Sequence, residues 1–301
     1  MPEIGYVLLT AAYVILAFYT GMILYAISGW KKLKYTEEKE PEHAVSILIA
    51  ARNETANIET VIRDIHKQNY PQGLFELIVI DDHSEDDTLA KCQGLQTEFP
   101  RLKVLSNAEG EGKKSALSCG IKEAQFAILA TVDADCRVPS EWLLTMISHW
   151  KTEETKMLLG PVVLEPAITV LERVQSLEMH AIMGLTGGFA AKGNPIMANG
   201  ANIFFDKKAF EEIGGYGSSE NPSGDDVFTM LSFNEKWPNS VAFSRDYEGV
   251  VLTAPQPTFS AFWQQRKRWL SKKGGYQNNW VKGTAIISYL ANLVAFCSLI
   301  A

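Results

Sequence analysis

The stretch FAILATVDADCRVP, from Phe126 to Pro139, decides the fold of this chain. Its apolar first half has the composition of a buried strand, and this run ends abruptly in the sequence DAD. Side chains two positions apart on a strand point to the same side of the pleat, so Asp133 and Asp135 repel each other unless a cation lies between them. Oxygen ligands at a strand end favour Mg²⁺ or Mn²⁺. The alternative is that the two carboxylates only cap the turn before the next helix.

Apolar runs and helical patterns alternate upstream of this stretch. Runs rich in Val, Ile and Leu predict buried strands, and the segments between them have helical periodicity. We expect strands at 44–51, 76–81 and 102–105 and helices at 56–68, 86–98 and 113–123. This order specifies an α/β fold with a mostly parallel sheet, whose ligand crevice lies at the carboxyl ends of the strands. Polar residues follow two of those strands, as Arg52-Asn53-Glu54 and Asp81-Asp82-His83-Ser84.

The composition is that of an acidic chain of 301 residues, with a formal charge of -7 and a pI near 5.4. This balance excludes a nucleic-acid-binding protein, which needs cations to neutralise phosphates. The four cysteines form no CxxC pair and the five histidines form no HExxH group, which argues against a zinc site. Scattered cysteines of this kind indicate apolar fillers in a reducing compartment.

Both ends of the chain carry uncharged apolar segments. Residues 4–30 as a helix extend about 40 Å, enough for a bilayer core of about 30 Å. A cleaved signal peptide is the alternative, but this segment lacks a basic start and is too long. Lys31, Lys32 and Lys34 follow it, which by the positive-inside rule places the next residues in the cytosol.

The second apolar segment follows Lys272, Lys273 and Lys282. The sequence stops inside this segment, so we expect a longer protein with further membrane helices. The predicted organisation is a transmembrane helix at 1–30, a cytosolic α/β domain at 31–255, an interfacial amphipathic helix at 256–282 and the start of a second transmembrane helix at 283–301. We therefore expect a protein integral to the cytoplasmic membrane.

Two common nucleotide motifs are excluded. A dinucleotide-binding fold needs GxGxxG after its first strand, where this chain has the sequence ARNE at 51–54. The segment GEGKKS at 110–115 resembles a P-loop, but Asn107 occupies the first glycine position and Lys114 intervenes before Ser115. Neither an ATPase nor a dehydrogenase fits.

Seven short motifs together resemble family 2 of the glycosyltransferases, which has the GT-A fold. They are VSILIAARNE (45–54), IVIDDHSEDDT (78–88), GKKSAL (112–117), TVDADC (131–136), GANIFFDKKAFEEIGGY (200–216), GDDVF (224–228) and QRKRW (265–269). The last resembles Q(Q/R)xRW, which is typical of the membrane-embedded branch with the cellulose, chitin and hyaluronan synthases and the ceramide glucosyltransferases. His83 departs from the family pattern DDGS, which has glycine at that position.

The resemblance implies roles for the nucleotide-binding residues. Asp81 or Asp82, with Glu54, would contact the uracil base or the ribose of a UDP-sugar, because a carboxylate accepts from the base N–H. The alternative for the two aspartates is helix capping, a role that Ser84, Asp86 and Asp87 fit better. Lys113 resembles the family lysine that reaches the diphosphate, and Lys114 is expected at the surface.

The resemblance also implies a metal site and a catalytic base. Asp133 would lie near the donor sugar and, with Asp135, hold Mg²⁺ or Mn²⁺ against the diphosphate. Asp226 resembles the general base that takes the proton of the acceptor hydroxyl, whereas Asp225 fits an N-cap. A single displacement inverts the anomeric carbon, so an α-linked donor gives a β-linked product.

Residues 259–270 have the spacing of an amphipathic helix. Phe259, Phe262, Trp263 and Leu270 form an apolar stripe for the membrane interface, with Arg266 and Lys267 expected to reach lipid headgroups. On another sector, Gln265 and Arg268 would approach the diphosphate and Trp269 would face an acceptor. The alternative is a plain amphipathic anchor.

Two further segments remain open at this stage. Residues 166–192 predict a helix that either lies at the membrane interface or belongs to the core. The sequence NGAN at 199–202 allows either a close approach of backbone to a ligand or a bulge in a strand.

The sequence as a whole predicts a membrane-anchored inverting glycosyltransferase that transfers sugar from a UDP-sugar to a lipid or a growing polysaccharide. A non-catalytic nucleotide-sensing membrane subunit that kept the fold and a membrane-associated nucleotidyltransferase are the alternatives. The intact set of Asp133, Asp135, Asp226 and residues 265–269 argues against the first, and the last motif argues against the second.

Overall fold

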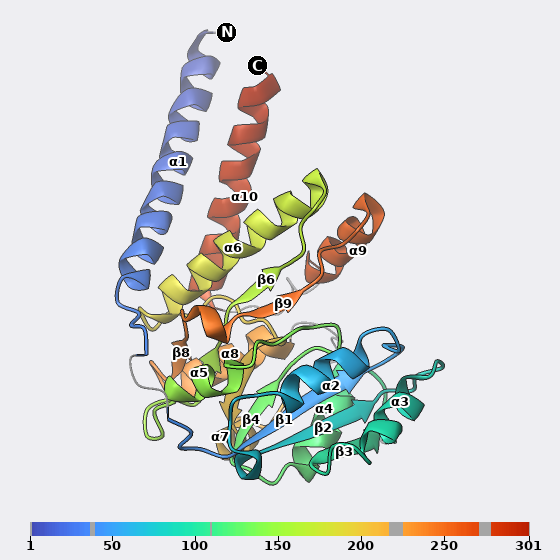
Figure 1. Ribbon diagram of the computed structural model, residues 1–301. Helices are drawn as coiled ribbons and strands as arrows, with labels where there is room; N and C mark the ends of the chain where they lie inside the picture. The colour runs from blue at the N-terminus through green and yellow to red at the C-terminus, as the bar shows by residue number, and fades with distance from the viewer. Residues whose placement is uncertain (1, 37–39, 109, 217–224, 271–277, 301) are drawn as a thin grey trace.

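A seven-stranded sheet lies at the centre of the computed structural model, which describes residues 2–36, 40–108, 110–216, 225–270 and 278–300 (Figure 1). Its strand order is β3-β2-β1-β4-β7-β5-β8. The strands are β1 (Val45–Ala51), β2 (Phe75–Asp81), β3 (Leu102–Ser106), β4 (Ile128–Thr131), β5 (Met157–Leu159), β7 (Ile203–Asp206) and β8 (Val241–Phe243). Only β7 runs antiparallel to its neighbours among these described strands. The predicted mostly parallel sheet is confirmed.

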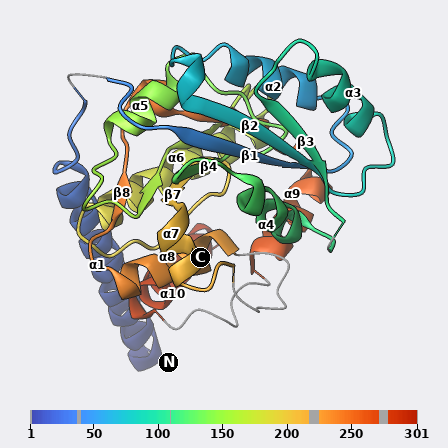
Figure 2. The ribbon, with the colours of Figure 1, turned by 90° about the horizontal axis from the view of Figure 1, so that it is seen from below.

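Helices cover both faces of the sheet (Figure 2). On one face lie α2 (Ile58–His66), α3 (Thr88–Leu95) and α5 (Trp142–Ser148). On the other lie α4 (Lys113–Glu123), α7 (Lys207–Glu212) and α8 (Asp225–Lys236). Both faces of the parallel strands are thus covered, which is why β2 is buried along its whole length and has the apolar run LIVI at 77–80 in its middle.

A smaller layer extends the domain towards the chain termini. The strands β6 (Val162–Leu164) and β9 (Val251–Thr253) pair in parallel, and the helices α6 (Val170–Ala190) and α9 (Phe259–Leu270) continue from them (Figure 1). The C-terminal half of α6 belongs to the core, where Met179 and Met183 are buried. Its N-terminal half exposes Val170, Val174 and Leu177. The core alternative for residues 166–192 is therefore confirmed for the C-terminal half of the helix, and the interface alternative stays a prediction for its exposed N-terminal half.

Two long helices, α1 (Pro2–Trp30) and α10 (Asn279–Ile300), project side by side from this layer (Figure 1). Among the described residues, Leu9–Trp30 and Asn279–Ser298 are long and apolar enough to cross a membrane. The C-terminal end of α1 packs on α6, and the backbones of the two helices are in direct contact. A Cβ atom on Gly188 would lie 2.2 Å from the carbonyl oxygen of Ala26, so only glycine permits this crossing.

We expect Gly188→Ala to lower the free energy of unfolding by about 2 kcal/mol, because the added methyl group forces α1 away from α6. Thermal unfolding of the detergent-solubilised protein measures this effect. Gly184→Ala is the matched control on the same helix, since nothing lies within 4 Å of its added Cβ. This control should gain up to about 1 kcal/mol in helix propensity. Equal effects of the two substitutions would contradict the proposed importance of the crossing.

Candidate functional site

The predicted site residues of the first two strands and β4 come together at one edge of the sheet. The parallel register pairs Ala51 with Asp81 and Leu48 with Thr131, so the carboxyl ends of β1, β2 and β4 lie side by side. Asp81 is the last residue of β2, and Glu54 and Asp133 lie in the loops that follow β1 and β4. The sheet therefore gathers carboxylates from three separate parts of the sequence.

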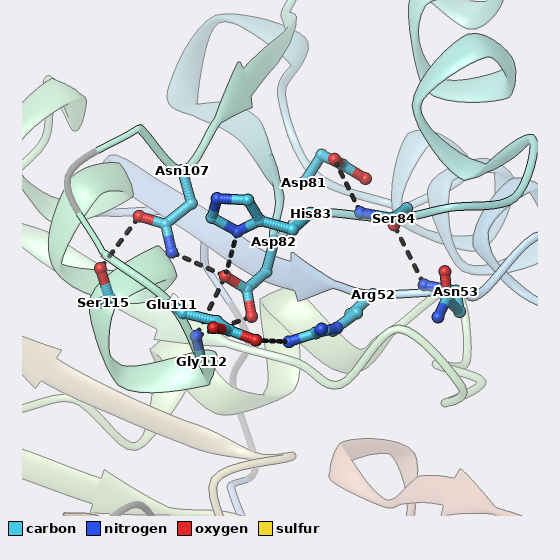
Figure 3. Close-up of polar contacts among 10 residues, drawn as sticks. All are labelled: Arg52, Asn53, Asp81, Asp82, His83, Ser84, Asn107, Glu111, Gly112 and Ser115. Atoms are coloured by element: carbon cyan, nitrogen blue, oxygen red, sulfur yellow. Dashed lines mark hydrogen bonds and ion pairs between the residues drawn. The ribbon is translucent and has the colours of Figure 1, made fainter.

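Asp82 fastens the loop that precedes α4 (Figure 3). Its buried carboxylate accepts hydrogen bonds from Asn107 Nδ2 at 2.7 Å and from the backbone N–H of Gly112 at 2.8 Å. Ser115 Oγ, in the first turn of α4, donates to Asn107 Oδ1 at 2.9 Å. Gly112 has a φ of +93°, a conformation that favours glycine. These bonds fix the direction in which Lys113 leaves the loop.

Asp81 differs from its neighbour because it keeps an open acceptor. Its Oδ2 accepts a hydrogen bond from the backbone N–H of Ser84 at 3.3 Å, whereas the buried Oδ1 has no partner among the described residues (Figure 3). A buried carboxylate oxygen without a donor is costly. The two adjacent aspartates are thus distinguished by their bonding: Asp82 accepts several hydrogen bonds within the fold, and Asp81 has one oxygen without a donor among the described residues.

Asp86, one of the residues expected to cap a helix, makes a hydrogen bond at the start of α3. Asp86 Oδ1 accepts from the backbone N–H of Thr88 at 3.0 Å, at the start of α3. Asp87 occupies the N-cap position without a side-chain hydrogen bond. Ser84 Oγ instead accepts from the backbone N–H of Asn53 and so links the ends of β1 and β2 (Figure 3).

His83 adopts a φ of +60°, in the left-handed region where a side chain is strained. This conformation explains why glycine suits the position. Its Nδ1 lies 3.3 Å from Asp82 Oδ1 (Figure 3).

We expect His83→Gly to raise the free energy of unfolding by about 1 kcal/mol, because relief of the left-handed strain outweighs the weak contact with Asp82. Chemical denaturation measures this free energy of unfolding. Asn239→Gly is the control, since Asn239 has a φ of +67° but asparagine tolerates that region. A loss of stability in His83→Gly alone would show that the imidazole contact dominates.

Lys113, at the start of α4, lies beside carboxylates from two other segments of the chain. Its Nζ forms an ion pair with Asp133. Desolvation lowers the pKa of Lys113, but the charges of Asp133 and Asp226 outweigh it, so the pKa lies above its ordinary value. Asp226, at the start of α8, accepts a hydrogen bond from the backbone N–H of Gly200 at 3.0 Å. One cluster is thus formed by three residues that are distant in sequence: Lys113, Asp133 and Asp226.

Asp135 and Glu54 add negative charge next to this cluster. Asp135 is open to solvent on one side, yet desolvation by the surrounding protein raises its pKa, and the charge of Asp133 raises it further. Desolvation also raises the pKa of Glu54, with additional contributions from the charges of Asp135 and Asp133. Crowded carboxylates of this kind fit a hard divalent cation such as Mg²⁺ or Mn²⁺.

A divalent metal ion at this position would need ligands from outside the protein. Among the described residues, no group of three or more His, Cys, Asp or Glu side chains is arranged to hold a metal ion by itself. Asp133 and Asp135 provide two carboxylates, which suits an ion that takes its remaining ligands from phosphate oxygens and water.

The structure corrects the placement of Arg266. This residue was expected to reach lipid headgroups from α9, but its side chain is 14% exposed and forms an ion pair with Glu178 of α6. Its guanidinium group lies 4.2 Å from the ring centre of Trp269. The helical spacing of α9 did not show that α6 packs against this face. Lys267 is exposed, and its contact with lipid headgroups stays a prediction.

The other residues of the QRKRW motif occupy different environments. Trp269 packs against the apolar core that contains Val132 and Ala134, the neighbours of Asp133. Gln265 is half-buried and Arg268 is exposed. The predictions for the side chains of Asp225 and Leu270 and for Lys272 and Lys273 fall outside the described residues.

The sequence did not predict two contacts of candidate site residues, that of Asn107 with Asp82 and that of Gly200 with Asp226. In the sequence, Asn107 was used only to exclude a P-loop. An amide side chain that follows a strand and precedes the sequence GEG is nevertheless a suitable hydrogen-bond donor for Asp82. NGAN at 199–202 is a turn before β7, not a bulge, and it lies against Asp226. No local pattern could have identified that contact.

Comparison with known proteins agrees with this geometry. The family model "Glycosyl transferase family 2" matches residues 46–214, more than half of the chain. A beta-monoglucosyldiacylglycerol synthase of Trichormus variabilis is 32% identical over 243 residues, which cover 77% of this chain and 49% of that protein. A poly-beta-1,6-N-acetyl-D-glucosamine synthase of Staphylococcus epidermidis is 24% identical over 82% of this chain and 58% of that protein.

A solved structure has a similar fold. The mannosyltransferase PcManGT from Pyrobaculum calidifontis, in complex with GDP-Man and Mn²⁺, has a TM-score of 0.68 and 18% identity, covering 94% of this chain and 80% of its own. The chain spans about half the length of the first curated relatives that it matches. The GT-A-like sheet, the carboxylate cluster at its edge and the family match establish that this chain belongs to glycosyl transferase family 2.

Proposed function

We propose that this protein transfers a sugar from a UDP-sugar to the headgroup of a membrane lipid, with inversion at the anomeric carbon. The observation that carries the proposal is the cluster of Lys113, Asp133 and Asp226 at the carboxyl edge of the sheet. It provides a cation for a diphosphate, a metal ligand and a base within one site. The 32% identity to a monoglucosyldiacylglycerol synthase favours a lipid acceptor over a polysaccharide.

Asp81 is proposed to recognise the base. It offers one open, buried oxygen, because its other oxygen accepts from Ser84. Uracil presents a single N–H on its pairing edge, whereas guanine presents an N–H and an NH₂ group. One acceptor therefore matches uracil. Glu54 lies at the end of the adjacent strand and is proposed to contact the base or ribose, while Asp82 holds the neighbouring loop.

Lys113, Asp133 and Asp135 are proposed to bind the diphosphate. Asp82 and Asn107 fix the loop from which Lys113 extends, so its ammonium group is preorganised for an anion. Asp133 and Asp135 would hold Mg²⁺ or Mn²⁺, which neutralises the charge that develops on departing UDP. Gln265 and Arg268 of α9 are proposed as further diphosphate contacts.

Asp226 is proposed to act as the general base. Its carboxylate takes the proton of the acceptor hydroxyl while that oxygen forms a bond to the anomeric carbon. The bond from the anomeric carbon to the diphosphate oxygen breaks at the same time, and its electron pair leaves with UDP. The incoming and departing groups lie on opposite faces, which inverts the configuration.

The surroundings of the site suit a membrane acceptor. Val174 and Leu177 of α6 and Phe259 and Trp263 of α9 are exposed in the layer from which α1 and α10 project. We propose that these side chains enter the membrane interface on the cytosolic side, as the three lysines after α1 indicate. Trp269 is proposed to help position the acceptor.

The test uses membranes that carry the full-length protein, Mn²⁺ and a panel of UDP- and GDP-sugars, with mass spectrometry of the products. A new glycolipid from a UDP-sugar alone supports the proposal. A polymer ladder in the aqueous phase would replace the lipid with a polysaccharide acceptor. Preference for a GDP-sugar would overturn the role of Asp81. Absence of product and of released nucleotide above an Asp226→Asn background would favour a sensing subunit.

A further inference from the structure

The turn at 199–202 connects the end of β4, which precedes Asp133, with Asp226 at the start of α8. Thr131, the last residue of β4, donates a hydrogen bond from Oγ1 to the carbonyl oxygen of Gly200 at 2.8 Å. The backbone N–H of Gly200 then donates to Asp226 Oδ2 at 3.0 Å. Thr131 is 4% exposed, so water competes little for the first bond. A single chain of two hydrogen bonds thus runs from β4 to α8.

This turn is rigidly held by Asn202. The fully buried side chain of Asn202 accepts from Trp142 Nε1 at 3.0 Å and donates to the carbonyl oxygens of Pro161 and Gly249, both at 2.9 Å. Its backbone N–H closes the turn on Asn199 at 3.0 Å. A side chain with this many satisfied bonds has one orientation, and it holds in place the turn that contains Gly200.

Gly200 also contacts the Asp226 carboxylate too closely for any other residue. A Cβ atom at this position would lie 2.6 to 2.8 Å from the carboxylate atoms of Asp226. Glycine is therefore needed at this position because of the close contact with Asp226, and the backbone conformation of the turn does not itself require it.

We propose that Thr131 and Gly200 are positioning residues for Asp226, which rests on the proposed role of Asp226 as the base. The N–H of Gly200 holds Oδ2, which would leave Oδ1 to take the proton of the acceptor hydroxyl. Thr131 lies two residues before Asp133 on the same chain segment, and the β4–β7 register pairs it with Ile203. The end of β4 therefore positions both Asp133, on the diphosphate side, and Asp226, the proposed base. This arrangement would fix the distance between the leaving group and the acceptor.

The test compares Thr131→Val with Thr131→Ser in the full-length protein. Valine has nearly the same shape but cannot donate, whereas serine keeps the hydroxyl group. We expect Thr131→Val to lower kcat about 10- to 100-fold, as a misplaced catalytic group does, with the KM for donor and the Kd for UDP within about twofold of wild type. Thr131→Ser should retain kcat within about threefold, because it preserves the hydrogen bond to Gly200.

Gly200→Ala provides an independent variant, since it displaces Asp226 directly. It should lower kcat at least as much as Thr131→Val, again with UDP binding preserved. Normal kcat in both variants, with activity lost in Asp226→Asn, would overturn this inference and leave the proposed function standing. Equal loss of kcat and UDP binding in the valine and serine variants would assign Thr131 a structural role and also overturn it. Activity retained in Asp226→Asn would instead refute the proposed base.

Discussion

Asp226→Asn is expected to lower kcat for sugar transfer about 10³-fold, because general-base catalysis contributes about 10² to 10⁴ and an amide cannot take the acceptor proton. The asparagine carbonyl can still accept from Gly200, so the start of α8 should keep its place. We therefore expect the Kd for UDP and the thermal stability to stay close to wild type. Single-turnover transfer with radiolabelled donor measures the chemical step.

The matched control for this substitution is Glu235→Gln, which removes one charge from an exposed position on the same helix. Its kcat should be unchanged, since surface charges at a distance from a site are screened. An Asp226→Asn enzyme with wild-type kcat would remove the base from the mechanism. A variant that loses UDP binding as well would show that Asp226 holds Lys113 in place and would leave its catalytic role unsupported.

Much of the fold follows from local pattern. The predicted helix at 113–123 coincides with α4, and the predicted strand at 44–51 differs from β1 by one residue. Both segments are bounded by residues that decide their ends, such as Gly112 before α4. In a parallel sheet the strands are covered on both faces, so each apolar run is a strong signal. The position of the site at the carboxyl edge follows from that topology.

The division of labour between Asp81 and Asp82 could not be predicted. The two residues are adjacent and chemically identical, so the sequence leaves both as candidates for the base contact. The structure separates them through Asn107, which lies 25 residues from Asp82 and donates to it. Long-range partners of this kind determine which carboxylate is engaged and which keeps an open oxygen.

The two faces of α9 illustrate a second limit. Helical spacing describes one helix in isolation and assigns Arg266 to the lipid edge. Glu178 and the ring of Trp269 enclose its guanidinium group instead. Burial of Arg266 follows from the packing of α6 against α9, and that packing is specified by residues elsewhere in the chain.

Asp135→Asn is expected to raise the Mn²⁺ concentration for half-maximal activity at least about tenfold and to lower kcat/KM about 100-fold. The reason is electrostatic: desolvation and then the charge of Asp133 raise the pKa of Asp135, desolvation and the charges of Asp135 and Asp133 raise that of Glu54, and the same concentration of negative charge attracts a divalent cation. Removing one carboxylate weakens that attraction, and Lys113 already pairs with Asp133. Mn²⁺ titrations of activity and of UDP binding by calorimetry measure the shift. Glu123→Gln, exposed at the far end of α4, is the control and should keep the wild-type Mn²⁺ dependence. If Asp135→Asn shows the same Mn²⁺ dependence as wild type, Asp135 is not a ligand, and the diphosphate is neutralised by Lys113 and Arg268 without it.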